Sequence, residues 1–548
     1  MSKENNVIEQ NSICQPLLTD YYQVTMSYAY WKANCHEEHA VFDLFFRKNP
    51  FQGEYTIFAG LEDVIRFIQN FKFSESDLKF LKTIMPETTE AEFFVYLASL
   101  NCNNLKIAAI PEGSVTFPKV PLITVEGPLA VCQLLETSLL NLVNYASLVA
   151  TNAARFRHVA GNNVELLEFG LRRAQGPNGG LSASKYCFLG GFDGTSNVLA
   201  AKLFGIPAKG TQAHSFICSF NTENDFKNRN LVSKDRKEKV DILSASKEKL
   251  SFLYDTLSWP VAREEISQSE LIAFCAYAVS FPNAFLALID TYDVLRSGVI
   301  NFLAVTLVLY DLGYQCLGCR IDSGDLCYLS TELRSIFNRI GTAIPKYSNC
   351  VNKLKIVASN DIKEETIQSF NEQGHEINSF GVGTHLVTCQ KQPALGCVYK
   401  LVAMGGIPKI KLSQEVAKIS IPGKKNCYRI YGKSNYSILD LMTLETEEAP
   451  EPGKQILCRH PFEEGKRALV IPSKVEKLQE LYWDHGVLKK EMPTLLEIKE
   501  NLTRSMKTIR KDHCRFINPT PYKVSVTEKL YEFLHEIWLQ NAPVGKLE

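Results

Sequence analysis

Short apolar runs alternate with longer helical patterns through the middle of the chain. Each run is four to six residues long and is followed closely by Gly, Asp, Arg or Ser. Parallel strands buried on both faces give runs of this kind, and α/β barrels gather polar residues at the strands' carboxyl ends. We therefore predict an α/β barrel over residues 151–397, with an open doubly wound sheet as the alternative. The predicted strands are 165–169, 206–209, 284–289, 314–319, 354–358 and 377–380.

The segments on both sides of this region indicate a mixed α+β layer. Apolar and polar residues alternate there in short stretches, and helical patterns cover 61–71 and 89–99. A long helical pattern over 129–156 leads into the barrel. We assign residues 12–150 to an α+β sandwich domain that 398–445 completes. Its predicted strands are 40–46, 55–59, 105–109, 114–117, 122–125, 398–404, 409–412, 418–421, 428–431 and 438–444.

An acidic, proline-rich connector at 445–453 marks the next boundary. Beyond it, amphipathic patterns over 473–485 and 492–510 predict helices. We expect residues 446–548 to form a C-terminal, mainly helical domain with a structural role.

Charge and length exclude several classes of function. Lys plus Arg and Asp plus Glu each total 60 in 548 residues, so no net charge favours nucleic acid or an acidic membrane. Residues 1–11 lack the pattern of a signal or transit peptide, so we expect a cytoplasmic protein. The longest apolar stretch, 271–289, is interrupted at Pro282. We predict a helix ending before this proline and a strand leading to Asp290.

The cysteines are predicted to be core thiols. All 16 are scattered among apolar neighbours, and the CxxC at Cys316–Cys319 has no second pair at zinc spacing. His36 and His39 are three residues apart, where the metalloprotease motif needs four.

Polar motifs follow several of the predicted strands, so they are expected to share one pocket. Glycine backbone amides at Gly381, Gly383 and Thr384 suit a phosphate at the start of a helix. Ser359 and Asn360 follow another strand and either bind the same phosphate or cap a helix. The other motifs are Phe169–Arg173, Gly210–Ser215 and Arg320–Asp325.

Together with Leu17–Gln23, these motifs resemble the eukaryotic nicotinate phosphoribosyltransferase family over nearly the whole chain. The resemblance implies an irregular α/β barrel like that of type II phosphoribosyltransferases. It also implies a first step of NAD synthesis, in which nicotinate and phosphoribosyl pyrophosphate give nicotinate mononucleotide and pyrophosphate. ATP hydrolysis would be coupled through a phosphohistidine, which makes the transferase a ligase by class. Mg²⁺ or Mn²⁺ and a homodimer with shared active sites are further expectations.

A flat ring bearing a carboxylate needs aromatic faces and a bidentate cation. Phe169 and Arg320 suit these roles. Of two adjacent arginines on a strand, only one should face the pocket, and the family motif favours Arg172 over its neighbour. The resemblance also implies that Tyr22 stacks on the ring from the partner subunit, with Tyr21 as its rival. Thr211 has a hydroxyl for nicotinate or a phosphate.

Displacing pyrophosphate develops positive charge at the anomeric carbon, which a nearby carboxylate stabilises. Asp322 is the first choice because it lies two residues from Arg320, on the same side of a strand. Asp290 could contact the ribose or metal, while Asp325 is either a metal ligand or a helix cap. The resemblance makes His214 the phosphorylated residue; an imidazole can attack the terminal phosphate of ATP.

Alternative functions stay open at this point. The chain could be a nicotinamide or quinolinate phosphoribosyltransferase, or a non-catalytic relative that binds pyridine nucleotides. A phosphosugar lyase is less favoured because no lysine at a strand end looks placed for a Schiff base; Lys209 is the nearest candidate.

Overall fold

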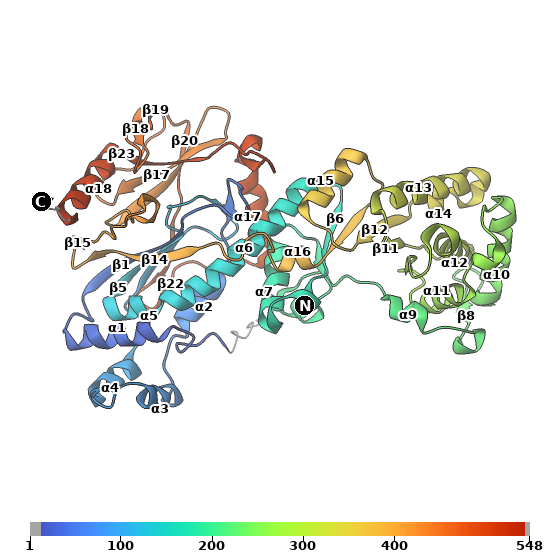
Figure 1. Ribbon diagram of the computed structural model, residues 1–548, viewed down its shortest axis with the longest axis horizontal. Helices are drawn as coiled ribbons and strands as arrows, with labels where there is room; N and C mark the ends of the chain where they lie inside the picture. Colours follow the sequence, from blue (N-terminus) through green and yellow to red (C-terminus); the bar gives the residue numbers. More distant parts are fainter. Residues whose placement is uncertain (1–12, 543–548) are drawn as a thin grey trace, which may run out of the picture. The chain divides into compact units, whose positions relative to one another are not determined.

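The computed structural model describes residues 13–542, and the chain divides into two compact units (Figure 1). Unit 1 takes the chain up to Ala154 and again from Cys389 onwards, and unit 2 runs from Arg155 to Thr388. The division lies within ten residues of the limits predicted for the central region. Helix α6 (Glu136–Ala160) runs from the first unit into the second.

Unit 2 is built on a six-stranded parallel sheet with the order β10-β11-β12-β13-β6-β7. An isolated parallel bridge joins Thr195 to Ala208, where a strand was predicted over 206–209. Among residues 13–542 no ladder joins β7 to β10, so the paired strands form a sheet whose closure into a barrel is not observed. The strands are β6 (Glu165–Glu168), β7 (Gly194–Thr195), β10 (Leu286–Leu288), β11 (Gly318–Ile321), β12 (Lys355–Ser359) and β13 (Ser379–Val382).

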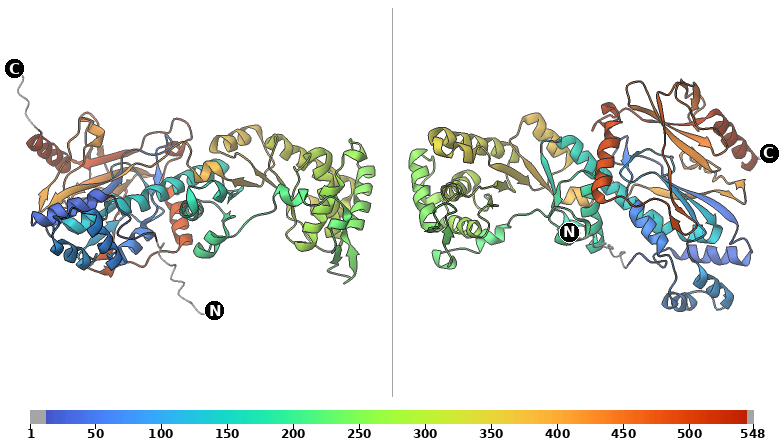
Figure 2. Two further views of the ribbon diagram at one scale, coloured as in Figure 1. Left: turned by 60° about the horizontal axis from the view of Figure 1, so that its bottom comes forward. Right: turned by 180° about the vertical axis from the view of Figure 1, so that it is seen from behind.

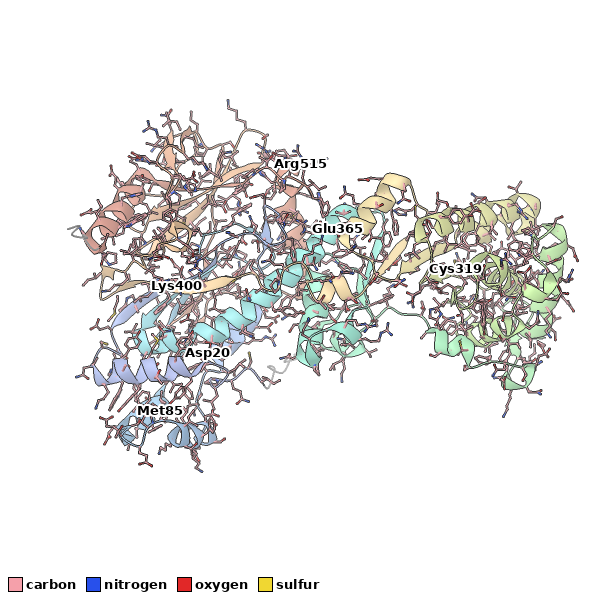
Figure 3. The ribbon with its side chains drawn as sticks, viewed as in Figure 1. Asp20, Met85, Cys319, Glu365, Lys400 and Arg515 are labelled. Carbon is pink, nitrogen blue, oxygen red and sulfur yellow. The ribbon has the colours of Figure 1, made fainter. Side chains whose placement is uncertain are left out.

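Gly318 allows the central strands β11 and β12 to lie close together. A Cβ atom at Gly318 would lie 1.9 Å from the carbonyl oxygen of Lys355, so no larger residue fits without moving β11 away from β12. The flanking Cys316 and Cys319 are buried, and Cys319 is labelled in Figure 3. Burial raises the pKa of the Cys319 thiol to about 12, so this thiol stays protonated near neutral pH. The CxxC is therefore part of the core.

Apolar helices pack beside β10 and β11. Helices α10 (Ile242–Thr256), α11 (Gln268–Ser280) and α12 (Val299–Asp311) contact one another, as both views in Figure 2 show. The prediction of a helix before Pro282 and a strand before Asp290 is confirmed by α11 and β10. The segment Val294–Asp311 is long and apolar enough to cross a membrane, but 78% of it is buried in the protein, as in a core helix.

Unit 1 contains two larger sheets. The first has the order β15-β14-β1-β5-β3-β21-β22 and the second β19-β18-β23-β17-β16-β20. The strands of the first are β1 (His39–Phe46), β3 (Lys106–Ala109), β5 (Ile123–Pro128), β14 (Cys397–Met404), β15 (Ile407–Pro408), β21 (Glu480–Asp484) and β22 (Val487–Leu488). Those of the second are β16 (Lys425–Tyr431), β17 (Ser437–Leu444), β18 (Ile456–Arg459), β19 (Arg467–Val470), β20 (Lys474–Lys477) and β23 (Lys523–Thr527).

The expectation of a separate, mainly helical C-terminal domain is wrong. Residues predicted as the helix 473–485 form β20 and β21, and β21 pairs with β3 near the start of the chain. Trp483 Nε1 donates to Cys102 O over 2.8 Å, which fixes that strand to the N-terminal part. Pairing with distant strands outweighs a local helical pattern here. Likewise, the strand predicted over 418–421 is absent, and Val416–Lys418 forms a 3₁₀ turn instead.

Helices cover these sheets at several places. Predicted helices 61–71, 89–99 and 492–510 are confirmed as α2, α4 and α17, while 129–156 is divided into α5 and α6. The helices of unit 1 are α1 (Tyr21–Lys32), α2 (Leu61–Gln69), α3 (Glu75–Ile84), α4 (Ala91–Ser99), α5 (Leu129–Leu134), α17 (Leu495–Lys507) and α18 (Glu528–Asn541).

Candidate active site

The carboxyl ends of β10, β11 and β12 bring several predicted residues together in unit 2. Asp290 follows β10, Arg320 lies in β11 with Asp322 just after it, and Ser359 ends β12. Parallel neighbours place these ends at the same edge of the sheet. The prediction that separate strand-end motifs meet is confirmed for these residues by the hydrogen bonds described below.

His214 is the first residue of α9 (His214–Cys218) and lies between a hydroxyl and two carboxylates. Its Nδ1 is 3.2 Å from Thr291 Oγ1. Its Nε2 is 3.6 Å from Asp322 Oδ2 and 3.9 Å from Asp290 Oδ1. The imidazole side chain is 43% exposed, so a ligand can reach it.

Arg320 ties three segments of the site together through four hydrogen bonds. Its Nε donates to Ser359 Oγ over 2.9 Å, and its Nη2 donates to Asp322 Oδ1 over 3.2 Å. Its Nη1 donates to Thr211 Oγ1 and to Gln212 O over 3.2 and 3.3 Å. A guanidinium has five N–H donors, so these four bonds leave one donor for a ligand. Arg320 therefore holds the loop before His214 in addition to any substrate contact.

The carboxylates differ in their surroundings. Asp290 is almost fully buried; its Oδ2 accepts from Asp322 N and Ser323 Oγ over 3.1 and 2.5 Å, while its buried Oδ1 has no hydrogen-bond donor. Ser359 Oγ donates to Asp322 Oδ1. Asp325 instead accepts from Tyr328 N over 3.0 Å and caps helix α13 (Leu326–Ala343). Of the two roles considered for Asp325, the structure shows the helix cap.

Phe169 lines the same region next to two glycines. The Arg320 guanidinium lies 5.7 Å from the centre of the Phe169 ring. A Cβ atom at Gly381 would come within 2.5 Å of Phe169 Cδ2 and 2.6 Å of its Cε2. Gly381 therefore leaves the space that the ring occupies, which explains a glycine at this strand end by packing as well as by phosphate binding.

Replacing Gly381 by alanine is expected to displace the Phe169 ring and to raise KM for the ring substrate roughly 10-fold or more, because overpacking of 1–3 kcal/mol falls on the pocket wall. Steady-state kinetics measures this change. Gly210 is the matched control, since a Cβ atom there meets nothing within 4 Å. An equal effect of Gly210→Ala and Gly381→Ala would contradict the packing argument.

The structure corrects the argument for Arg172. The strand ends at Glu168, and Leu171–Arg173 forms an exposed 3₁₀ turn, so the alternation of strand side chains does not decide between the two arginines. Tyr22 lies on α1 in unit 1 and is 48% exposed. Its rival Tyr21 is 46% exposed and donates its hydroxyl to Ile84 O over 3.0 Å, so exposure does not decide between the two rings.

The backbone at Asn360, in the predicted phosphate site, has an unusual conformation. Asn360 has φ of 92°, in a region that non-glycine residues rarely adopt. The helix that follows, α15 (Glu364–Gln373), has Lys363 as its N-cap, so the alternative of Ser359 and Asn360 as helix caps is wrong. Gly383 precedes α16 (Thr384–Val387), which has only one turn and therefore a weak dipole.

Several polar residues of this region were given no role from the sequence, although Gln212 and Ser323 lie within the predicted motifs. Thr291 and Ser323 contact His214 and Asp290 as described above. Both amide atoms of Gln212 are buried without a hydrogen-bond partner, next to the Arg320 clamp. Buried Glu168 accepts from Ser184 Oγ and Thr195 Oγ1 over 2.8 and 2.5 Å. Position just after the strand predicted over 284–289 was the available signal for Thr291, and position at the end of the strand predicted over 165–169 was that for Glu168.

Unit 1 carries a group of basic side chains. Burial lowers the pKa of Lys400, Glu136 raises it, and the positive charges of Arg47 and Lys411 lower it again. Lys400 is labelled in Figure 3. The Nε of Arg47 is buried without a hydrogen-bond acceptor. Repulsion among these groups would be relieved by an anion. They lie on or near β1 and β14, far apart in the sequence, so no local motif announces them.

A cavity of about 920 Å³ also lies in unit 1, but it contains none of the predicted site residues. Its lining includes Tyr431, Lys477, Tyr482 and Arg504 together with several glutamates. Opposite charges occur in similar numbers there, so its chemistry does not select one class of ligand.

The fold and the strand-end cluster define an α/β enzyme whose site combines an accessible imidazole with carboxylates and a guanidinium. Residues 17–144 match the family model of the nicotinate phosphoribosyltransferase N-terminal domain, and residues 424–534 match that of the C-terminal domain. Nicotinate phosphoribosyltransferase of Caenorhabditis elegans is 65% identical over 540 residues, which cover 98% of this chain and 96% of the relative. The chain belongs to the nicotinate phosphoribosyltransferase family.

Other relatives agree with this assignment. The human nicotinate phosphoribosyltransferase is 42% identical over 98% of this chain and 99% of its own length. The crystal structure of human nicotinic acid phosphoribosyltransferase superimposes with a TM-score of 0.85 and 40% identity, covering 95% of this chain and 99% of that one. A nicotinate-nucleotide pyrophosphorylase from Pyrococcus furiosus, 20% identical with a TM-score of 0.57, shares the fold over 92% of this chain and 99% of its own.

Proposed function

We propose that the protein transfers the phosphoribosyl group of phosphoribosyl pyrophosphate to nicotinate, as a step of NAD biosynthesis. The ring nitrogen of nicotinate forms a bond to the anomeric carbon, and pyrophosphate leaves with the electron pair of the broken C–O bond. The observation that carries the proposal is the convergence of His214, Arg320 and Asp322 at the strand ends. Family membership and the names of the relatives support the choice of substrates.

The site offers groups for each part of this reaction. Phe169 provides an aromatic face for the ring, and the remaining Arg320 donor with Thr211 Oγ1 suits a carboxylate. Asp322 stabilises the positive charge that develops on the ribose. Gly381, Gly383, Thr384, Ser359 and Asn360 are proposed to hold the phosphates, and Arg172, in an exposed turn, is proposed as a contact to nicotinate.

ATP coupling is proposed to pass through His214. If the Nε2 proton points to the two carboxylates, the Nδ1 lone pair remains for attack on the terminal phosphorus of ATP. A P–N bond then forms while the bond to ADP breaks. The hydroxyl of Thr291, 3.2 Å from Nδ1, would turn from this nitrogen to donate to an oxygen of the transferred phosphoryl group.

The acidic residues suit a divalent cation. Buried Asp290 Oδ1 lacks a donor, and Asp322 Oδ2 lies on the same side of His214, so two carboxylate oxygens are available. Mg²⁺ keeps several waters and binds through one or two carboxylates plus substrate phosphates. The described residues contain no cluster of three or more metal-binding side chains, which fits an ion shared with the substrate. Bound Mg²⁺ or Mn²⁺ would neutralise pyrophosphate charge.

We further propose that unit 2 closes into an irregular α/β barrel and that the enzyme acts as a cytoplasmic homodimer. The bridge at Ala208 extends the sheet beyond β7, towards closure. Exposed Tyr22 would stack on the nicotinate bound by the partner subunit. Analytical ultracentrifugation tests the homodimer, and the kinetics of a Tyr22→Ala variant test the stacking across subunits.

A comparison of nicotinate, nicotinamide and quinolinate tests the function. We expect a kcat/KM for nicotinate at least roughly 100-fold above those for the other two, since a site built for one ring carboxylate leaves polar groups unpaired with nicotinamide. Product formation is measured with purified protein and phosphoribosyl pyrophosphate. A preference for nicotinamide or quinolinate would replace the proposed substrate, and binding without turnover would indicate a non-catalytic relative.

A further inference from the structure

A buried glutamate lies behind the active site without a salt-bridge partner. Glu270, in the first turn of α11, is fully buried. Its Oε2 accepts from Ser297 Oγ over 2.6 Å and from Asn301 Nδ2 over 3.1 Å. Asn301 Nδ2 also donates to Ser267 O over 2.9 Å. Two neutral donors therefore bond one oxygen of a carboxyl group whose charge no cation balances.

The second carboxyl oxygen of Glu270 lacks the hydrogen-bond donor that an ionised carboxylate needs. Glu270 Oε1 is buried without a hydrogen-bond donor, and Asn301 Oδ1 is buried without one as well. Both atoms are acceptors when the glutamate is ionised, so neither can satisfy the other. The two groups already meet through Nδ2 and Oε2. One proton on Oε1 would complete a reciprocal pair between a carboxylic acid and a carboxamide.

This pair holds the segment that leads from the active-site strand. Ser297 lies in a π-helical turn, Val294–Gly298, and its backbone N–H donates to Asp293 O over 3.1 Å. Asp293 is only two residues from Thr291, which contacts His214. A Cβ atom at Gly298 would lie 1.9 Å from Ile289 O, so the turn is pressed against the end of β10. Single π-turns within helices are frequent at functional sites.

We infer that Glu270 is a positioning residue that carries a proton on Oε1, donates it to Asn301 Oδ1, and thereby fixes the π-turn behind Asp290 and Thr291. The inference deepens the proposed function, because the loop that it fixes supports His214. It assigns no contact with substrate to Glu270. Ionisation of the carboxyl would break the pair and loosen this loop.

The surrounding charges favour the neutral form. Burial raises the pKa of Glu270 to about 7, the hydrogen bonds from Ser297 and Asn301 oppose this, and the negative charges of Asp290 and Asp293 raise it further. Arg296, on the same turn, is 60% exposed and pairs with Glu265 instead. The folded-state pKa lies above the ordinary value of 4.5, so the stability that the protonated pair contributes is present at low pH and is lost as pH rises towards 7.

The substitution Glu270→Gln tests the inference, because glutamine keeps the shape and permanently supplies the donor that a protonated glutamate has. We expect the variant and the wild-type protein to melt at similar temperatures at pH 5, and the variant to melt roughly 3 °C or more higher at pH 8. The ratio of kcat, variant over wild type, should be near one at pH 6 and should rise with pH while KM stays unchanged. Taking the ratio removes pH effects that both proteins share.

Glu364→Gln is the matched control. This glutamate is also buried in unit 2, but it pairs with Arg155 over 3.0 Å, so its amide variant should lose stability at both pH values. The inference is overturned if Glu270→Gln fails to fold, melts lower than wild type at pH 8, or shifts the melting temperature equally at pH 5 and 8. It is also overturned if the kcat ratio does not change with pH. The melting arm needs no turnover, so its outcome separates this inference from a failure of the proposed reaction.

Discussion

His214→Ala is expected to uncouple ATP hydrolysis from product formation. Without the imidazole, the site beside Asp290 and Asp322 has no nucleophilic nitrogen to accept a phosphoryl group, and ATP-dependent turnover should fall by roughly 100-fold or more. Slow, ATP-independent transfer should remain, since Arg320, Phe169 and the carboxylates are unchanged. The measurement is the amount of ADP formed per nicotinate mononucleotide, with and without ATP.

Two further variants sharpen this experiment. His214→Gln keeps an amide that can bond Thr291 but cannot be phosphorylated at nitrogen, so it should behave like the alanine variant. His375→Ala is the control, because His375 lies in the same unit and bonds Asn371 over 3.2 Å, away from the carboxylates. ATP coupling that survives in both His214 variants would exclude the phosphohistidine. Loss of coupling in the His375 variant would mean that the assay reports damaged folding.

Much of unit 2 was predictable because its signals are local. An apolar strand buried on both faces reads as a continuous run, and Pro282 divides the helix α11 from β10 within a few residues. The C-terminal strands were not predictable in the same way. β21 is a strand because it pairs with β3, hundreds of residues earlier, and a short amphipathic segment satisfies helical and extended periodicities almost equally.

The site followed the same rule. Residues directly after predicted strands, such as Asp290 and Asp322, could be found from position alone, and the structure brings them to His214. The hydrogen-bond partners of each residue could not be found in this way. Sequence offered Arg320 as a ligand for a carboxylate, whereas four of its donors bond protein atoms. Glu270 lies in none of the sequence motifs, and its partners, Ser297 in the π-turn and Asn301 on α12, are brought to it by helix packing.

Arg320→Ala is expected to lower kcat/KM for nicotinate by roughly 30-fold to 4,000-fold. Cutting one member of a buried, hydrogen-bonded charged pair costs about 2–5 kcal/mol, and each 1.4 kcal/mol is a factor of ten. The carboxylate of Asp322 would lose one of its donors, the hydroxyl of Ser359 would lose its donor, and the loop at Thr211 would lose its tie to β11. Both kcat and KM should therefore change, because one side chain binds substrate and supports the loop before His214.

Three comparisons separate these two roles. Arg320→Lys supplies a charge but cannot bridge Ser359, Asp322 and Thr211 at once, so it should restore little of kcat. If the remaining N–H donor binds the ring carboxylate, either variant should reduce the preference for nicotinate over nicotinamide. Arg334→Ala is the control, since Arg334 bonds Leu354 O and Asn378 Oδ1 over 3.1 Å in the same unit. An unchanged preference together with a lowered kcat would leave Arg320 as a clamp alone, and unchanged kcat and KM would remove it from the site.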